Sequence, residues 1–124
     1  HARARWGDGP RIVAVEPDRA PALLEGLCAG RVVETAGAVS AMGRLDCKTA
    51  SLLALAALAR DADAFAAITE GEAEACVAAL GAEGVATSAS GAAGIAPLLV
   101  PGAAAALGVR SGARVLAFVT EGPA

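Results

Sequence analysis

Two serines and two glycines occur together where a helix is expected to begin. Residues 87–94 read Thr-Ser-Ala-Ser-Gly-Ala-Ala-Gly. The first backbone N–H groups of a helix have no intrahelical partner and carry the positive end of its dipole, so they attract anions and polar ligand atoms. Glycine lets a ligand approach the backbone closely. Ser88, Ser90 and Gly91 are therefore candidate binding residues; the alternative is that both serines only cap the helix.

Two further loops carry polar side chains. Residues 44–48 read Arg-Leu-Asp-Cys-Lys and precede an apolar segment, and residues 120–122 read Thr-Glu-Gly and follow one. The second loop adds three candidate binding residues, namely Thr120, Glu121 and Gly122. The alternatives are that Asp46 and Lys48 form a solvated or locally paired turn, and that Thr120 only ends a strand.

The sequence lacks the residues that several kinds of active site require. The only histidine is His1, and the three cysteines are scattered, with no Cys-x-x-Cys. Zinc sites and Ser-His-Asp triads are therefore not expected, and neither is a disulfide framework. The simplest interpretation of the cysteines is a reduced, cytoplasmic protein.

The composition indicates one folded domain. The chain has 124 residues, of which 56% are hydrophobic and 19% charged, so disorder is not expected. The net charge of −3 argues against nucleic-acid binding, which normally needs a basic face. Residues 85–109 carry no charge, but Pro97, Pro101 and several glycines interrupt them. We therefore expect no membrane-spanning helix.

Short apolar runs predict strands at residues 11–15, 64–68 and 114–119, and residues 32–33 are a candidate for a further short strand. Between them the sequence predicts helices. This alternation favours an α/β fold of three layers, with a mostly parallel sheet and helices on both faces.

The expected helices have recognisable ends. Asp18 is a candidate cap for the first, with Pro21 in its first turn and Gly30 at its end. The next starts at Thr49 or Ser51 and reaches residue 59; it is apolar on nearly every face, which predicts burial on all sides.

Further helices are expected in the second half of the chain. Thr69 and Glu72 fit a capping box for a helix that buries Ala73, Cys76, Val77 and Leu80. Two more are expected at residues 90–99 and 103–107.

Ligands of open parallel sheets bind beyond the C-terminal ends of the strands. Glu16, Thr69 and Thr120 each follow an expected strand. Ser88 and Ser90 begin a helix that is expected to face the same crevice, so we expect Ser90 and Thr120 to lie close together.

Four segments carry a resemblance to a known family. They are Val-Glu-Pro at 15–17, Met-Gly-Arg-Leu-Asp-Cys-Lys at 42–48, Ser-Ala-Ser-Gly-Ala at 88–92, and Val-Leu-Ala-Phe-Val-Thr-Glu-Gly at 115–122. In this order they resemble the fold-type II, tryptophan synthase β-like family of pyridoxal-phosphate enzymes, and most of all diaminopropionate ammonia-lyase and related lyases. The resemblance covers nearly the whole chain and implies that residues 1–124 are a single α/β fragment, the C-terminal part of such an enzyme.

The resemblance implies a lyase of the ammonia-lyase or β-elimination type that uses pyridoxal 5'-phosphate and acts on a small amino acid. It also implies a homodimeric intact enzyme. In the family a hydroxyl commonly bonds the pyridine nitrogen, and a neutral partner of this kind suits β-elimination. Ser90 and Thr120 match that position, and the choice between them stays open. Ser88, Gly91, Glu121 and Gly122 complete the expected cofactor-binding set.

The resemblance also implies what this stretch lacks. Family members form a Schiff base between the cofactor and a lysine near the enzyme's N-terminus, and a central glycine-rich loop binds the phosphate. Lys48 is the only lysine here and lies in another segment. We therefore expect no catalytic residue and no activity in this chain alone. The alternative functions are a non-catalytic α/β small-molecule-binding or regulatory module and a purely structural fragment.

Overall fold

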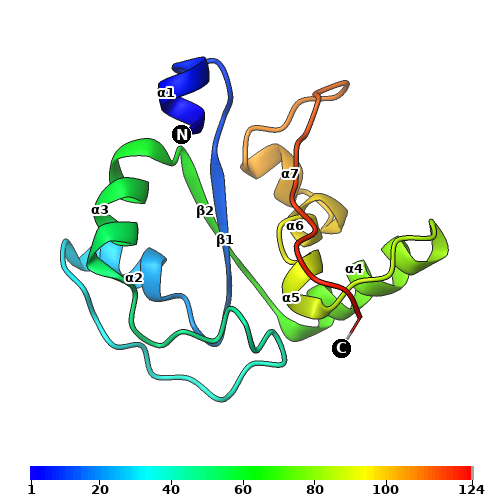
Figure 1. Cartoon of the computed structure of the whole chain (residues 1–124), viewed down its shortest axis with the longest axis horizontal. Coiled ribbons are helices and arrows are strands. Elements are labelled where there is room, and N and C mark those ends of the chain that lie inside the picture. Colours follow the sequence, from blue (N-terminus) through cyan, green and yellow to red (C-terminus); the bar gives the residue numbers. More distant parts are fainter. Residues whose placement is uncertain (124) are drawn as a thin grey trace.

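Two parallel strands run through the middle of the computed structural model, which describes residues 1–123 (Figure 1). They are β1 (Val13–Pro17) and β2 (Ala64–Ile68), paired in register from Val13 with Ala64 to Pro17 with Ile68. Both were expected from short apolar runs, although β1 begins two residues later than the run does. The predicted α/β class and parallel pairing are therefore confirmed, with a sheet of two strands in the described residues.

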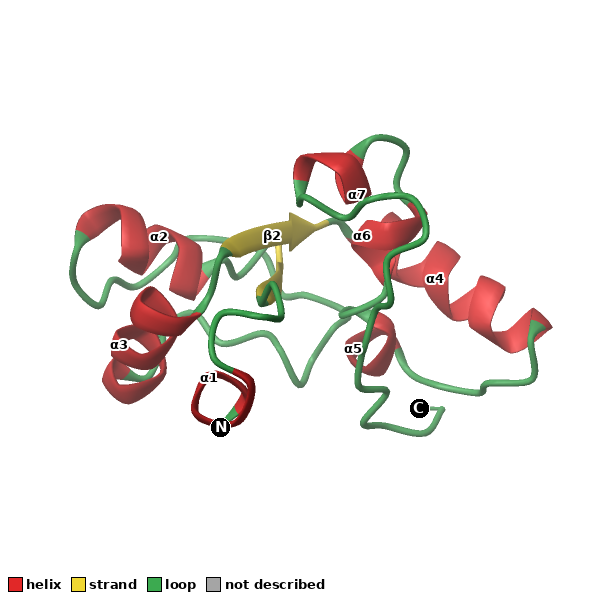
Figure 2. Ribbon diagram, turned by 90° about the horizontal axis from the view of Figure 1, so that it is seen from above, coloured by secondary structure: helices red, strands yellow, loops and turns green. Residues whose placement is uncertain are grey.

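Helices lie on both sides of the strands. On one side are α2 (Ala22–Ala29) and α3 (Leu52–Asp61). On the other are α4 (Glu70–Ala82), α5 (Ala89–Ala92), α6 (Ala96–Leu99) and α7 (Ala103–Ala106), while α1 (Ala2–Trp6) stands near the start of β1. The same division is visible from above (Figure 2). None of the helices in residues 1–123 has both the length and the apolar character needed to cross a bilayer.

The prediction of a strand at residues 114–119 was wrong. The segment belongs to no helix or strand and pairs with no other part of the described chain. A strand is defined by its neighbour, and the apolar run alone does not supply one. Residues 32–33 also lie outside the strands; close to them, Glu34 and Thr49 form an isolated antiparallel bridge.

The helix expected at residues 90–99 is divided into α5 and α6. Pro97 stands in the first turn of α6, where a missing N–H costs nothing. In a continuous helix, the Pro97 ring would clash with the carbonyl of Ala93, four residues earlier. The proline therefore fixes a new helix start.

The prediction that the helix before residue 60 is buried on all sides was also wrong. Only Leu55 of α3 is buried, whereas Leu52 is 68% and Leu53 83% exposed. The helix packs chiefly against α2, where Leu55 lies close to Gly26. Its N-cap is Ser51, one of the two expected starts, whose hydroxyl accepts the Ala54 N–H at 3.5 Å.

Asp18 does not cap α2, contrary to expectation. The Glu16 carboxylate instead accepts the N–H groups of Leu23 at 2.8 Å and Leu24 at 3.0 Å. Strand β1 directs this side chain to the start of α2, where the unpaired amides favour negative charge. The C-terminal prediction is confirmed, because Gly30 ends the helix with φ 66°.

The predicted capping box of α4 is confirmed. The Thr69 hydroxyl accepts the Glu72 N–H at 3.2 Å, and the Glu72 carboxylate accepts the Thr69 N–H at 2.7 Å. Ala73 and Cys76 are buried, while Val77 and Leu80 are half-buried against the same core. That core joins the end of β2 to the α4, α5 and α6 helices; its buried members are Met42, Ile68, Ala73, Cys76, Ala92, Ala93 and Ala96.

Candidate functional site

The loop that passes the C-terminal ends of the strands is held by the first residue of α4. The Glu70 carboxylate accepts the Ser40 hydroxyl at 2.6 Å and the Ala41 N–H at 2.7 Å. These bonds favour the ionised form and lower the pKa of Glu70. Ser40 also accepts the Met42 N–H at 3.1 Å, and the Met42 side chain is fully buried. The loop is thus fixed against the core.

Lys48 has a structural position in the same loop. Its ammonium donates to the carbonyl oxygens of Arg19 and Ala38, both at 2.8 Å, and to the Asp46 carboxylate at 2.5 Å. An ammonium has three N–H donors, so all three are engaged. The bond from Lys48 lowers the pKa of Asp46. The interpretation of these two residues as a locally paired turn is therefore confirmed.

The start of α5 is bonded to the end of the described chain. The Thr87 hydroxyl donates to the Glu121 backbone carbonyl at 2.8 Å, and the Ser88 hydroxyl donates to the Glu121 carboxylate at 2.6 Å. Ser88 also accepts the Gly91 N–H at 3.1 Å, which makes it the cap of the helix. Two adjacent hydroxyls therefore hold the main chain and the side chain of one glutamate.

Gly91 is required by the closeness of this contact. A Cβ atom there would lie 2.3 Å from the Thr87 hydroxyl oxygen and 3.2 Å from the Glu121 carbonyl oxygen. Real Cβ atoms essentially never come within 3.0 Å of another atom, so the distance to the Thr87 hydroxyl excludes a side chain at this position. In this structure the glycine serves the packing of two chain segments.

Ser90 joins a third segment to the site. Its hydroxyl oxygen accepts the Arg44 N–H at 3.2 Å. Its own O–H has no acceptor within residues 1–123, whereas the Ser88 O–H is engaged by Glu121. The capping alternative therefore applies to Ser88 and not to Ser90.

Thr120 is exposed, and its hydroxyl makes no hydrogen bond within the described residues. Ser90 and Thr120 are the chain neighbours of Gly91 and Glu121, and a Cβ atom added at Gly91 would lie 3.2 Å from the Glu121 carbonyl oxygen. The structure thus brings together the two segments that carry the predicted hydroxyls.

A polar crevice of about 500 Å³ opens beside this contact. Its lining consists of Arg44, Ser88, Glu121, Gly122 and Pro123. The Arg44 guanidinium lies 3.8 Å from the Glu121 carboxylate, with its side chain 82% exposed. Exposed pairs of this kind are screened by water, so the arginine stays available to an incoming anion. Three predicted residues, Ser88, Glu121 and Gly122, therefore line one crevice.

Sequence reasoning missed two residues of this site, Thr87 and Arg44. Thr87 stood in the same hydroxyl-rich segment as the predicted serines, so its type and position were a usable signal. Arg44 lies in one of the four segments that carried the family resemblance. Its approach to Glu121 joins residues far apart in the chain, so no local pattern indicated it. Glu16 and Thr69 take no part in the crevice, because each caps a helix.

Comparison with known proteins relates nearly the whole chain to one family. Residues 1–121 match the family model described as pyridoxal-phosphate dependent enzyme. A search of curated protein sequences gave no match.

Two solved structures share the fold. One is described as a threonine deaminase of T.th., with a TM-score of 0.73 and 18% identity over 82% of this chain and 35% of that chain. The other is a fungal L-serine ammonia-lyase from Rhizomucor miehei, with a TM-score of 0.75 and 19% identity over 97% of this chain and 38% of that one. The chain thus spans less than two fifths of the length of either protein.

Proposed function

Since the chain belongs to the family of pyridoxal-phosphate-dependent enzymes, we propose that it is part of a lyase that acts on a small amino acid. The reaction removes the α-proton and expels a β-substituent or an amine. The match of residues 1–121 to the family model carries this proposal. The fold shared with a threonine deaminase and an L-serine ammonia-lyase supports the choice of a lyase. Because those proteins are much longer, the activity is assigned to a polypeptide that contains this segment.

Two hydroxyls beside the crevice, which do not line it, suit the pyridine end of the cofactor. Ser90 and Thr120 each have an O–H group without an acceptor in the described residues, which is what a ring nitrogen needs from a neutral donor. When bound, pyridoxal phosphate supplies an electron sink, and a neutral partner at its ring nitrogen tempers that sink. Ser88 and Gly91 hold the two segments together, and Glu121 and Gly122 line the approach.

Lys48 does not fit covalent attachment of the cofactor. It is the only lysine, and its three donors bond two carbonyls and a carboxylate. Attachment there would break the bonds of this ammonium to Arg19, Ala38 and Asp46. We therefore assign the lysine of the proposed enzyme to a part outside these residues, and assign no turnover to this chain alone.

Ammonia release tests the proposal. The polypeptide that contains this segment and a cofactor-binding lysine is incubated with L-serine, L-threonine and 2,3-diaminopropionate, with and without pyridoxal phosphate. We expect ammonia release from at least one of them only when the cofactor is present. Stoichiometric cofactor binding without release from any small amino acid would contradict the lyase assignment. Failure to bind the cofactor at all would favour the non-catalytic binding or regulatory module.

A further inference from the structure

The carboxylate of Glu70, the first residue of α4, holds a loop segment by a buried hydroxyl. The Ser40 side chain is only 3% exposed, so its hydroxyl needs partners inside the protein. It donates to Glu70 at 2.6 Å and accepts the Met42 N–H at 3.1 Å, while the Ala41 N–H donates to the second carboxylate oxygen at 2.7 Å. Removal of the carboxylate would therefore take away the acceptor of a buried hydroxyl and of the neighbouring backbone N–H.

A turn carries this loop from Met42 toward α5. The Leu45 N–H donates to the Met42 carbonyl at 2.8 Å and closes a turn of residues 42–45. Arg44 is the third residue of the turn, and its N–H takes no part in the closing bond. It donates instead to the Ser90 hydroxyl oxygen at 3.2 Å. The position of this N–H therefore depends on how Met42 is held.

The bond from Arg44 orients the Ser90 hydroxyl. A serine hydroxyl has one donor and two acceptor lone pairs. The Arg44 N–H occupies one lone pair, which fixes the position of the oxygen and leaves the O–H to donate to a group away from the loop. Thr120 receives no such bond from the described residues. Of the two candidate hydroxyls, only that of Ser90 is thus oriented by the part of the chain that the structure describes.

We propose, on the basis of the function proposed above, that Glu70 is a positioning residue of the enzyme. Through the loop at residues 40–45 it holds the Arg44 N–H against Ser90, so that the Ser90 O–H is a fixed donor for the pyridine nitrogen of the cofactor. Glu70 does not line the crevice, and its side-chain bonds go to Ser40 and Ala41. Its effect on the site therefore passes through the loop.

Amide hydrogen exchange of the 124-residue chain tests the contact without any cofactor. Glu70→Ala and Ser90→Ala should each speed exchange of the Arg44 N–H at least about tenfold, because each frees it from its acceptor. Glu72→Ala is the control, since it breaks the capping box of the same helix but removes no bond to the loop. Unchanged exchange in Glu70→Ala, or equal acceleration in Glu72→Ala, would overturn the proposal.

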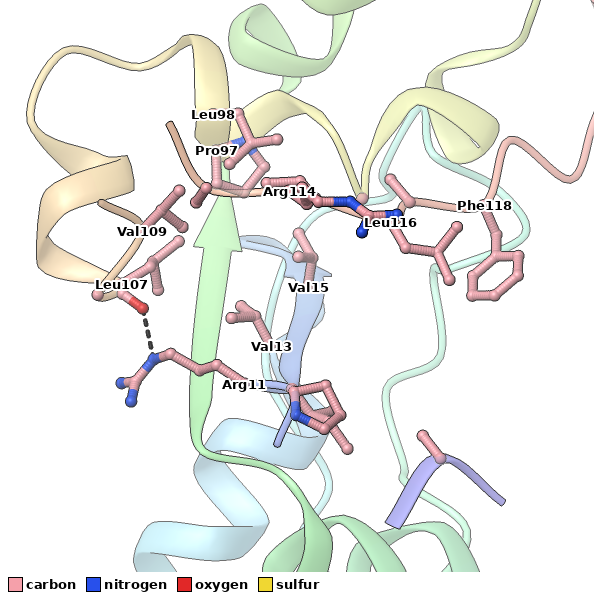
Figure 3. A pocket seen from close by; sticks show the side chains of 18 of the residues that line it. Arg11, Val13, Val15, Pro97, Leu98, Leu107, Val109, Arg114, Leu116 and Phe118 are labelled. Carbon is pink, nitrogen blue, oxygen red and sulfur yellow. Dashed lines mark hydrogen bonds between the residues drawn. The ribbon is translucent and has the colours of Figure 1, made fainter. Parts of the chain in front are cut away.

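Arg11→Ala is a second control, in another part of the molecule. Arg11 lines an apolar cleft beside β1 and donates from Nε to the Leu107 carbonyl at 2.6 Å (Figure 3). The cleft shares no residue with the loop at 40–45 or with the crevice. This variant removes a charged side chain that bonds a distant backbone group, as Glu70→Ala does. Exchange at Arg44 should stay as in the wild type, and an equal acceleration would overturn the proposal by showing general loosening.

A double-mutant cycle tests the link to the cofactor in the polypeptide that contains this segment and a cofactor-binding lysine. Glu70→Ala and Ser90→Ala should shift the absorbance of the bound cofactor in the same direction. The double variant should have the kcat and the spectrum of Ser90→Ala alone, because both changes act on one donor. The effects of Glu70→Ala and Thr120→Val on the logarithm of kcat should add. Additive effects of Glu70→Ala and Ser90→Ala would overturn the proposal.

Glu70→Gln is the conservative variant and serves also if Glu70→Ala fails to fold. It keeps the side-chain length and one acceptor oxygen, so its spectrum and its exchange at Arg44 should lie between those of the wild type and Ser90→Ala. Ammonia release by the wild type, with no effect of either Glu70 variant on the spectrum, would overturn the positioning role and leave the proposed function standing. A wild type that binds no cofactor would contradict the proposed function, and with it the role of Ser90 as a cofactor donor.

Discussion

Glu121 is bonded at both its main chain and its side chain, by Thr87 and Ser88 respectively. The fully buried Gly91 lies beneath it, so that the last described segment lies against α5 without a side chain between them. This arrangement leaves Ser90 and Thr120 next to the contact with unengaged O–H groups. The positions of the two candidate hydroxyls therefore depend on Gly91 and Thr87, neither of which needs to touch a ligand.

Gly91→Ala should destabilise the chain by about 1–3 kcal/mol, because the added methyl group would overlap the Thr87 hydroxyl and displace its bond to Glu121. Urea unfolding measures the change. Gly94→Ala is the matched control, since a Cβ there meets no atom within 4 Å; it should change stability by less than about 0.5 kcal/mol. Equal effects of the two substitutions would show that the contact is loose.

In the proposed intact enzyme, Ser90→Ala or Thr120→Val should lower kcat and shift the absorbance of the bound cofactor. The change in unfolding free energy should stay within about 0.5–1.5 kcal/mol, the usual contribution of one hydrogen bond. Ser51→Ala is the control: it removes a serine hydroxyl from the start of α3, far along the chain from the crevice. An unchanged spectrum in both site variants would remove Ser90 and Thr120 from the cofactor site.

At the scale of elements, the α3 helix has one buried face and one exposed face, although both carry leucines. Leu55 is 6% exposed against α2, while Leu53 is 83% exposed. Leu55→Ala should lower the unfolding free energy by about 2–5 kcal/mol, and Leu53→Ala by less than about 0.5 kcal/mol. Thermal or urea unfolding of the two variants measures the difference. Similar losses would mean that both leucines are buried in solution.

The link between α4 and the loop at residues 40–42 should be sensitive to acid. Its bonds to Ser40 and Ala41 lower the pKa of Glu70 below the ordinary value of 4.5. A carboxyl with a lowered folded pKa stabilises the fold above its unfolded pKa, and this stability is lost as the pH falls through the folded pKa. Below pH 4.5 the stability of the wild-type chain should therefore fall more steeply than that of Glu70→Gln.

Urea unfolding at a series of pH values checks this difference. Glu74→Gln is the control, because Glu74 is an exposed residue of the same helix and makes no side-chain hydrogen bond in the described chain. Its stability should follow the wild-type dependence on pH. Identical slopes for all three proteins would show that Glu70 does not hold the loop.

The elements that the sequence predicted correctly have local signals. The capping box at Thr69 and the glycine at position 30 act within a few residues, and short apolar runs form β1 and β2. The errors concern contacts between distant residues. Whether residues 114–119 form a strand depends on a partner, and whether α3 is buried depends on what packs over Leu52 and Leu53. Asp18 was expected to cap α2, but the Glu16 side chain does so, because β1 places it beside the start of the helix.

For the candidate site, residue types were predictable and their bonds were not. Each of the two predicted segments contributes to the crevice, which Ser88 lines from residues 87–91 and Glu121 and Gly122 line from residues 120–122. The bonds of Glu121 to Thr87 and Ser88 join residues more than thirty positions apart in the chain. No local pattern specifies such a contact, so the supporting roles of Thr87 and Arg44 emerged only from the fold.

At the scale of the whole molecule, the chain combines a crevice held by several hydrogen bonds with surfaces that expose apolar side chains. The edge of β1, the segment 114–119 and the outer face of α3 all leave apolar groups or backbone exposed. The two solved relatives extend far beyond the matched part. The crevice residues are thus one portion of a proposed larger site, to which this chain contributes hydroxyls and an arginine but no available lysine.

This division of roles predicts the outcome of borohydride reduction. The 124-residue chain is treated with pyridoxal phosphate, reduced, digested and mapped by mass spectrometry. We expect no stoichiometric label on Lys48, since its ammonium is bonded to Arg19, Ala38 and Asp46. The Asp46→Asn variant is the positive control for detection. It weakens one of these bonds, so labelling of Lys48 should increase. Specific, stoichiometric labelling of Lys48 in the wild-type chain would contradict its structural role and would return this lysine to the candidates for cofactor attachment.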